Sequence, residues 1–394
     1  MGSPARSRRA AQELLGYSCR ALYPVTLMSQ IVHVSAQPWN IELNEPFGIA
    51  TGAQVVAANV LVKVQLADGT VGLGEAAPFP AVNGETQALT LAALQDSAAQ
   101  VVGHGVADWV HVALDVRDAF GMNKSALCGL ETALLDAFCK SRKISLWSWA
   151  QTQGATLPRS VNTEPQLSTD ITIPTGSIQS AHRAALAAAT NGFHVLKIKV
   201  GGGDVQQDVQ RCLTVLNAAP RAQLVIDGNA ALTVSNAAAL IDALSDVRDR
   251  IALFEQPTPK HDLDALREVG SLTRLSIAAD ESAGSEQDVE RLASTKASDV
   301  INIKIMKSGV VEALRMIGTA KRLGLGLMVG GMVESELAMA TSACIAAGIG
   351  GFDHIDLDTP LFMKGSPTRG GVHRLGPVIT IDSRCFGHGV EPND

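Results

Sequence analysis

Five charged residues recur at near-constant intervals along the second half of the chain. They are Lys199, Asp227, Glu255, Asp280 and Lys304, separated by 28, 28, 25 and 24 residues. Each lies at or within a few residues of the end of a short apolar segment. Because an interval of this length accommodates one strand, one helix and two loops, the pattern predicts consecutive βα units. Charged side chains at successive strand ends indicate one shared site.

The three acidic residues of this set have the chemistry of a site for a hard metal ion. Carboxylates that converge on one arc repel each other unless they share a cation. Oxygen ligands without His or Cys favour Mg2+, with Mn2+ as a substitute. A single Asp after a strand often only caps the next helix, and Asp280 could do so. Three acids in register with flanking lysines favour the metal site instead.

The lysines suggest proton transfer. Lys197 and Lys199 lie two residues apart on one predicted strand, so their side chains project to the same face. Two ammonium groups this close disfavour double protonation, and we expect one lysine to have a lowered pKa and to act as a general base. An ion pair with a carboxylate is the commoner fate of a single lysine. Lysines on both sides of a metal-bound carbon acid would instead catalyse racemisation or epimerisation through an enediolate.

A barrel would position these groups. Strand-like segments alternate with helical ones from about Leu157 to Gly370, and we count eight: TDITIP, HVLKIKV, QLVIDGN, IALFEQP, LSIAADE, VINIKIMK, GLGLMVGG and FDHIDLD. Eight such units predict an α/β fold with a (β/α)8 TIM-like barrel over residues 155–370, whose functional groups collect at the C-terminal strand ends. Lys199 falls on the second strand and Lys304 on the sixth, on opposite sides of the barrel mouth. The three acids fill the arc between them.

The preceding segment has the pattern of a small α+β domain. Alternating apolar residues from Ile31 and the Asp68-Gly69 hairpin-turn signal predict a three-stranded meander, followed by helices over residues 85–102 and 125–150. We expect a capping domain over residues 31–154, joined by the C-terminal segment 371–394, in which we expect His388 to be exposed. Loops rich in Pro and Gly at residues 46–52 and 77–86 are candidates to cover the site.

Composition argues against several other classes of protein. The net charge of −7 and the lack of a basic stripe argue against nucleic-acid binding. The longest uncharged stretch near the C-terminal half, residues 337–352, is shorter than the roughly 18 residues of a membrane span. Six scattered cysteines favour a reducing compartment, and we expect a cytoplasmic protein. A homo-oligomer is compatible with the sequence.

Residues 1–30 differ from the rest of the chain. They contain four arginines and a single acid, Glu13. This composition is compatible with a disordered or targeting segment, and equally with an upstream extension before an alternative start at Met28.

The motifs around these residues resemble those of the enolase superfamily, muconate-lactonising-enzyme subgroup. The K-I-K, D-G-N, E-Q-P, A-D-E-S and N-I-K elements carry this resemblance, which extends over residues 31–390. Enolase-superfamily sites use a Lys or His base with Mg2+. The resemblance implies one Mg2+ per subunit, with the following roles: Asp227, Glu255 and Asp280 as ligands, Lys199 and Lys304 as acid/base catalysts, and Lys197 as the assistant of Lys199.

The eighth predicted strand distinguishes between reactions within this subgroup. Its D-L-D element, Asp356 and Asp358, resembles the D-x-D motif of the dipeptide epimerases, where it holds the α-ammonium group of the substrate. Two carboxylates on one face of the strand, opposite the metal, would hold the ammonium end of an extended zwitterionic substrate. The alternative is that the two aspartates only form a structural turn. We therefore predict an epimerase that inverts the α-carbon of the C-terminal residue of L,L-dipeptides.

The loop at residues 46–52 bears on the choice of substrate side chain. Epimerases that act on Ala-Glu often present an Arg from this loop, and the corresponding position here is Thr51. Phe47, Ile49 and Thr51 offer apolar and small polar surface, so we expect hydrophobic or unspecific second residues.

Two other hypotheses about the function are compatible with the sequence. A muconate-type cycloisomerase or an o-succinylbenzoate synthase would retain the same lysines and acids without needing an ammonium-binding pair. A catalytically idle barrel with a binding role is the alternative of another class. The presence of all five charged strand-end residues argues against it, because burying so many charges without a function is costly.

Overall fold

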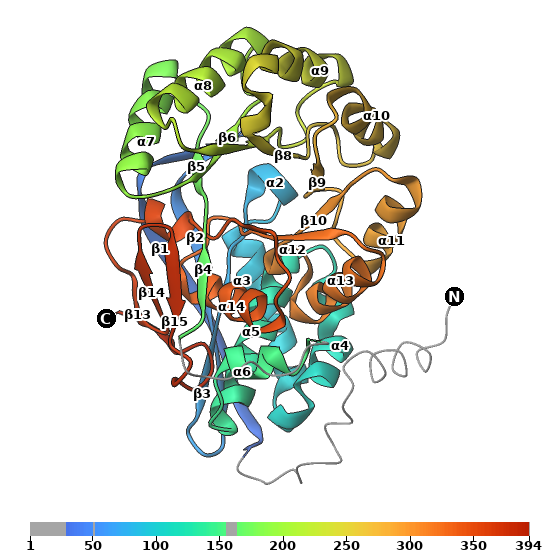
Figure 1. Ribbon diagram of the computed structural model, residues 1–394. Helices are drawn as coiled ribbons and strands as arrows, with labels where there is room; N and C mark the ends of the chain where they lie inside the picture. The colour runs from blue at the N-terminus through green and yellow to red at the C-terminus, as the bar shows by residue number, and fades with distance from the viewer. Residues whose placement is uncertain (1–28, 50–51, 155–163, 394) are drawn as a thin grey trace.

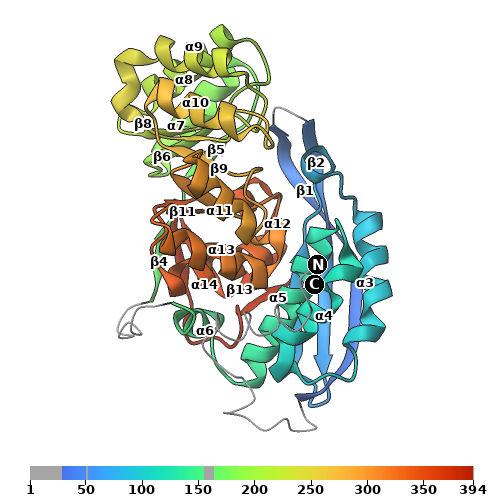
Figure 2. The same ribbon diagram turned by 90° about the vertical axis from the view of Figure 1, so that its right-hand side faces the viewer.

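The computed structural model describes residues 29–49, 52–154 and 164–393. These residues form a curled parallel sheet surrounded by helices and, beside it, a capping domain made of an antiparallel sheet and helices (Figures 1 and 2). This is the predicted architecture, a modified (β/α)8 barrel with an N-terminal α+β domain. In the described part of the chain, no helix is both long and apolar enough to cross a membrane.

The capping domain begins with the expected meander. Its antiparallel strands are β1 (Ile31–Ile49), β2 (Gly52–Leu66) and β3 (Val71–Ala76). The predicted turn follows β2, where Gly69 has a φ of +88° and Asp68 Oδ1 accepts a hydrogen bond from Thr70 N at 2.9 Å. That φ lies in the left-handed region that glycine adopts without strain.

Helices cover one face of this sheet. They are α2 (Pro80–Asn83), α3 (Gln87–Val101), η3 (Val106–Asp108), α4 (Trp109–Phe120), α5 (Lys124–Ser141) and α6 (Leu146–Gln151). Helix α5 lies directly on β3, and a Cβ atom at Gly74 would overlap the carbonyl oxygen of Gly129. The sequence analysis missed α4, although Trp109, Val112 and Val116 are buried at helical spacing.

All eight predicted barrel strands are present, and they neighbour one another in chain order in one parallel sheet. They are β5 (Ile171–Ile173), β6 (Val195–Lys199), β7 (Gln223–Asp227), β8 (Ile251–Glu255), β9 (Ile277–Ala279), β10 (Val300–Ile303), β11 (Gly326–Val329) and β12 (His354–Ile355). The helices between them are α7 (Ile178–Thr190), α8 (Val205–Ala218), α9 (Val234–Ala243), α10 (Leu263–Thr273), α11 (Glu286–Thr295), α12 (Ile305–Ser308), α13 (Val310–Arg322) and α14 (Glu336–Ile349), with the 3-10 turn η4 (Ser245–Arg250). A second 3-10 turn, η5 (Thr359–Phe362), follows β12.

The first and last barrel strands meet through hydrogen bonds that involve side chains. Asp170 N donates to Ile355 O at 2.9 Å, and Leu357 N donates to Thr169 Oγ1 at 2.9 Å. Two residues further along, Thr172 N donates to a carboxylate oxygen of Asp358 at 2.6 Å. These hydrogen bonds hold the residues that follow β12 against β5 and the residues that precede it.

The C-terminal segment returns to the capping domain. Its strands are β13 (Thr368–Gly370), β14 (Val372–Leu375), β15 (Val378–Ile381) and β16 (Val390–Pro392); β13 pairs with β16, and β15 pairs with β14 and with β4 (Gln166–Ser168). Further along, Gly387 O accepts a hydrogen bond from Leu146 N at 2.7 Å. The contact of Gly387 joins this segment to the capping domain, whereas the pairing of β15 with β4 joins it to the strand before the barrel, so the division at residues 154 and 370 stays a prediction.

The expectation that His388 is exposed is wrong. Its side chain is fully buried, its Nδ1 accepts a hydrogen bond from Val390 N at 3.0 Å, and its Nε2 lies 3.1 Å from Leu73 O. Gly387 and Gly389 on either side have φ values of +66° and +71°. These glycines allow the backbone conformation that places the histidine side chain inside the protein. The polar, glycine-rich sequence around it gives no sign of this burial.

Two carboxylates of the capping domain sit at the N-termini of barrel helices. Glu75 accepts hydrogen bonds from the backbone and hydroxyl of Ser335, at 3.0 and 2.7 Å, where α14 begins. Glu131 accepts one from Val311 N at 2.9 Å, where α13 begins. Helix N-termini favour negative charge. Burial nevertheless raises the pKa of both, that of Glu131 to about 7.

Candidate active site

The structure brings the five regularly spaced charges to one edge of the curled sheet. Lys199, Asp227 and Glu255 are the last residues of β6, β7 and β8, and they lie side by side in the strand register. Asp280 and Lys304 directly follow β9 and β10. The charges therefore meet at the C-terminal ends of five adjacent parallel strands.

Lysine ammonium groups and carboxylates contact one another directly at this edge. Lys199 Nζ lies 2.6 Å from Asp227 Oδ2, and Lys304 Nζ lies 2.7 Å from Asp280 Oδ2. Lys197 Nζ lies 3.0 Å from Asp227 Oδ2 and 2.8 Å from Glu255 Oε2. All of these side chains are buried. The acids are thus held in place and partly neutralised by three cations.

Burial and these ion pairs shift the pKa values in opposite directions. Burial would raise the pKa of Asp227, but Lys199 and Lys197 hold it at about 2. Burial would lower the pKa of Lys197, but the carboxylates of Asp356, Glu255 and Asp227 hold it well above its usual range. The prediction of a lowered lysine pKa is therefore wrong for Lys197, because three acids from other strands outweigh its lysine neighbour.

Three further residues fix the acids, and the sequence analysis assigned them no role. Lys307 Nζ lies 2.6 Å from Asp280 Oδ1 and also donates to the Asp280 carbonyl oxygen at 2.5 Å. Asn302 Nδ2 donates to Glu255 Oε1 at 2.8 Å, and Gln256 Oε1 accepts from Asp280 N at 3.0 Å. Asn302 and Gln256 belong to the N-I-K and E-Q-P motifs, and Lys307 follows Lys304 by one helical turn.

The residues present fit a hard divalent cation. Asp227, Glu255 and Asp280 supply carboxylate oxygens from neighbouring strand ends, the donor type that Mg2+ prefers. Two more oxygens close to them, Asn229 Oδ1 and Glu281 Oε2, are buried without a hydrogen-bond partner among the described residues. Burial and the nearby charge of Asp280 raise the pKa of Glu281 to about 8.

A cavity opens at this edge of the barrel. Lys199 and Lys304 both line it, from strand ends four strands apart in the sheet. Its other lining residues come from both domains: Phe47, Phe79, Val82, Thr172, Lys197, Asn229, Asp280, Glu281, Gly331, Met332, Asp356, Asp358 and Thr359. The cavity therefore joins the two lysines, apolar side chains and four acids, which are Asp280, Glu281, Asp356 and Asp358.

Most of the apolar wall belongs to the two loops that the sequence analysis singled out. Phe47 lines the cavity as predicted, and its ring packs edge-on against Phe362 at a centroid distance of 5.2 Å. Thr51 lies outside the described residues, and for Ile49 the structure describes only the backbone, at the end of β1. Phe79 comes from the second loop, where its position in a P-F-P sequence gave no separate signal.

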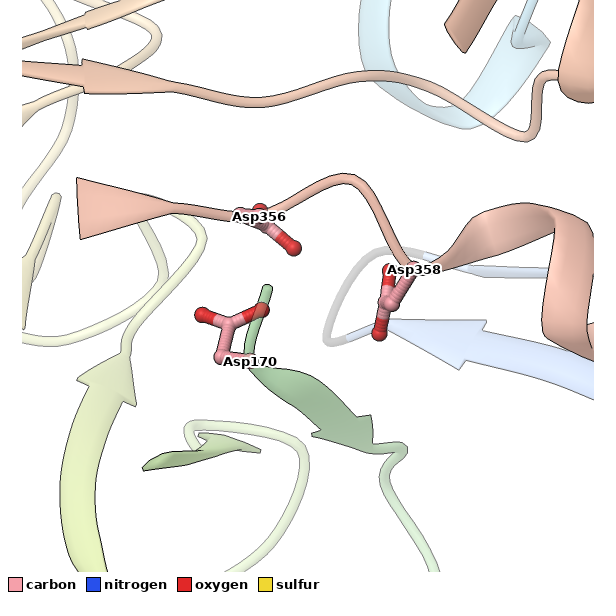
Figure 3. Close-up of side chains that lie close together, drawn as sticks. All are labelled: Asp170, Asp356 and Asp358. Atoms are coloured by element: carbon pink, nitrogen blue, oxygen red, sulfur yellow. The ribbon is translucent and has the colours of Figure 1, made fainter. Parts of the chain in front are cut away.

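The D-L-D element lies at the same cavity, beyond Lys197. Asp356 Oδ2 lies 2.7 Å from Lys197 Nζ, and Asp358 Oδ2 accepts the hydrogen bond from Thr172 N. Figure 3 shows both carboxylates with that of Asp170, a residue that the sequence analysis overlooked. Burial and the charge of Asp356 raise the pKa of Asp358 to about 6. Lys197 thus connects this acidic cluster with the acids of β7 and β8.

Comparison with known families and proteins agrees with this geometry. Residues 30–149 match the N-terminal domain of mandelate racemase and muconate lactonizing enzyme, and residues 179–394 match the enolase C-terminal domain-like family. The chain is 45% identical to an aromatic dipeptide epimerase of Herpetosiphon aurantiacus, over 91% of this chain and 97% of that protein. It is 38% identical to a hydrophobic dipeptide epimerase of Citrifermentans bemidjiense, over 90% and 98%.

A solved structure extends the comparison. A dipeptide epimerase of Enterococcus faecalis in complex with Mg and L-Leu-L-Tyr superimposes with a TM-score of 0.84 at 29% identity, covering 92% of this chain and 99% of that one. Both domains are thus accounted for by one family. The chain belongs to the family of mandelate racemase and muconate lactonizing enzyme, with the enolase-type barrel and capping domain.

Proposed function

We propose that this protein is a Mg2+-dependent epimerase that inverts the α-carbon of the C-terminal residue of L,L-dipeptides. One observation carries the proposal: lysines from strand ends four strands apart line the same cavity as the acidic pair Asp356 and Asp358. The named activities of the relatives, dipeptide epimerases with aromatic or hydrophobic substrates, support it.

Lys199 and Lys304 are the two acid/base groups of this proposal. The neutral amine of one lysine takes the α-proton from one face of the substrate carbon, and the ammonium group of the other lysine delivers a proton to the opposite face, so the configuration inverts. Because proton transfer needs a neutral and a charged lysine in turn, each must leave its ion pair with Asp227 or Asp280 for part of the cycle. Lys197, held by three carboxylates, stays charged and keeps the acids in place.

Asp227, Glu255 and Asp280 are the residues that would hold the metal. Bound there, Mg2+ would supply positive charge to the substrate carboxylate and offset the negative charge that develops when the α-proton leaves. We propose one Mg2+ per chain, held by the strand-end acids that contact Lys197, Lys199 and Lys304. Mn2+ should substitute, because it accepts the same oxygen donors.

Asp356 and Asp358 are proposed to bind the α-ammonium group at the other end of the dipeptide. Charge-assisted hydrogen bonds to a carboxylate are the strong ones among hydrogen bonds in proteins. A muconate-type cycloisomerase or an o-succinylbenzoate synthase acts on a substrate without an ammonium group, so two buried acids at the cavity wall favour the epimerase.

The side-chain preference follows from the apolar wall. Phe47, Phe79, Val82 and Met332 surround part of the cavity, so we propose apolar or aromatic residues at the C-terminal position of the substrate. Among the cavity residues in the described part of the chain, no arginine is present to pair with an acidic substrate side chain.

The test is deuterium incorporation. The protein with Mg2+ is incubated in D2O with pooled L,L-dipeptides, and mass spectrometry follows the α-position of each residue. Deuterium should enter the C-terminal residue, fastest for apolar side chains, and chelation of the metal should stop it. The variant Asp280→Asn, which weakens the proposed metal site, is the matched control. No incorporation across the pool would refute the epimerase and point to cycloisomerase or synthase substrates.

A further inference from the structure

Asp170 is a buried acid beside Asp356 and Asp358 that the proposed mechanism leaves without a role. It precedes β5, is 3% exposed, and is held by the hydrogen bond from its backbone to Ile355 O. Its Oδ1 atom has no hydrogen-bond partner among the described residues. A buried carboxylate oxygen without a donor is costly, so this one is placed for a group that arrives from outside the chain.

The carboxylates of Asp170, Asp356 and Asp358 converge on one point. Figure 3 shows their oxygens directed into a common space between the ends of β5 and β12. One oxygen of each lies within 4.8 Å of the others. For three atoms this close, some point lies within about 2.8 Å of all of them, which is the N–H···O distance of an ammonium–carboxylate pair. A primary ammonium group has three N–H donors, one for each acid.

The charges of this cluster are not balanced within the described part of the chain. Its cation is Lys197, which contacts Asp356 but also serves Asp227 and Glu255. Asp358 Oδ1, like Asp170 Oδ1, has no hydrogen-bond partner among the residues described. Three buried carboxylates facing part of one ammonium charge require a further positive charge or a bound proton.

The free protein meets this requirement with a proton. Burial, together with the charges of Asp356 and Asp358, holds the pKa of Asp170 well above its usual range, against the opposing charge of Lys197. Glu255 acts in the same direction as the two aspartates. A cation that enters the cluster makes the proton unnecessary, so its binding should release the proton to solvent.

We propose that Asp170 is the third acceptor for the α-ammonium group of the substrate, together with Asp356 and Asp358. The inference rests on the proposed function, because the ammonium group is that of the dipeptide. A second metal ion in the cluster is the competing occupant. The ammonium group of Lys197, 2.7 Å from Asp356, repels a doubly charged ion at this point about twice as strongly as a singly charged ammonium group.

The test compares two ligands of the same shape. L-Ala-L-Phe carries the ammonium group, and N-propionyl-L-Phe has a hydrogen atom in its place. Calorimetry measures the binding of each to the Mg2+-loaded protein and to its Asp170→Asn variant. We expect the variant to bind L-Ala-L-Phe about 10 to 100 times more weakly, as for a lost hydrogen bond to a charged group, and N-propionyl-L-Phe with unchanged affinity. The exposed-residue variant Asp264→Asn should behave like the wild type.

Titrations in two buffers of different ionisation enthalpy give a second readout that needs no variant. The wild-type protein should release a proton when it binds L-Ala-L-Phe and none when it binds N-propionyl-L-Phe. The inference would be overturned if Asp170→Asn weakened the binding of both ligands equally. It would also be overturned if the wild type released no proton and the variant bound L-Ala-L-Phe with unchanged affinity, or if the wild type bound a second Mg2+ that Asp170→Asn does not bind. If the wild type binds L-Ala-L-Phe as described but incorporates no deuterium, the proposed function fails and the ammonium site stands.

Discussion

Replacing Lys304 with Gln removes one proposed base and leaves the proposed metal ligands supported. Asp280 loses the ammonium group at 2.7 Å but keeps that of Lys307 at 2.6 Å. Asp227 keeps its contacts with Lys197 and Lys199. Glutamine has a similar length but cannot take up or deliver a proton here. The variant therefore separates proton transfer from metal binding.

The size of the effect follows from the roles of the two lysines. A positioned general acid or base contributes about 100-fold to 10,000-fold in rate, or about 3 to 5 kcal/mol of activation free energy. Epimerisation uses both lysines, so Lys304→Gln should lose at least this factor. Exchange of the α-proton on the face served by Lys199 needs Lys199 alone and should stay within about tenfold. Removing a positive charge beside the acids should leave Mg2+ affinity unchanged or higher.

The assay supplies L-Ala-L-Phe and L-Ala-D-Phe separately in D2O with Mg2+, and records deuterium in the recovered substrate and in its epimer. Lys304→Gln should exchange only one of the two substrates, and the matched variant Lys199→Gln only the other. Calorimetry checks the metal site. If both variants exchange the same epimer, or if either keeps more than about a tenth of the epimerisation rate, the two-base reasoning is refuted.

Four further outcomes follow from the structure. The pKa of Glu131 is raised from 4.5 to about 7, so the folded chain binds this proton more tightly than the unfolded chain does. The free energy of unfolding should therefore fall by about 3 kcal/mol as pH rises through this window. Urea unfolding at pH 4.5 and 7.5 should show a smaller fall in Glu131→Gln, and an unchanged fall would contradict the assignment. Glu75→Ala should lower the free energy of unfolding by about 3 kcal/mol, because buried donors at the start of α14 lose their acceptor; a change below about 1 kcal/mol would argue against the cap. Phe79→Ala should lower kcat/KM about tenfold or more for aromatic substrates and little for L-Ala-L-Ala, whereas an equal loss for both would exclude a side-chain contact. Mg2+ at a hundred times its Kd should stabilise the wild type by about 2.7 kcal/mol in thermal unfolding, and the same gain in Asp280→Asn would place the metal elsewhere.

The barrel and its charged edge were predictable from the sequence because both depend on local patterns. Each strand is a short apolar segment between helical ones, and Lys199, Asp227 and Glu255 end three of these segments directly. Parallel strands linked by helices bring all such ends to one edge, so spacing along the chain becomes proximity in space. The five charges needed no long-range information beyond the number of strands.

The remainder of the site depends on contacts that span the whole barrel. Asp170 precedes the first barrel strand, where a single acid in the sequence indicates only a turn. It comes close to Asp356 and Asp358 because the first and last barrel strands meet. The pKa of Lys197 is likewise decided by acids from three other strands rather than by its neighbour Lys199. Such contacts leave no periodic signal in sequence.

The distribution of charge around the cavity accounts for which carbon of a dipeptide would react. At one end, Lys199, Lys304 and a bound cation would attract the substrate carboxylate, whereas at the other the acids around Asp170 exceed their cations and attract its ammonium group. A zwitterion that enters in this orientation places the carbon next to its carboxylate, that of the C-terminal residue, beside the two lysines. The N-terminal α-carbon lies at the acidic end, where Lys197 is held by three carboxylates and its raised pKa makes it a poor base. Inversion of the C-terminal residue alone is therefore a consequence of the charge asymmetry as well as of the placement of the bases.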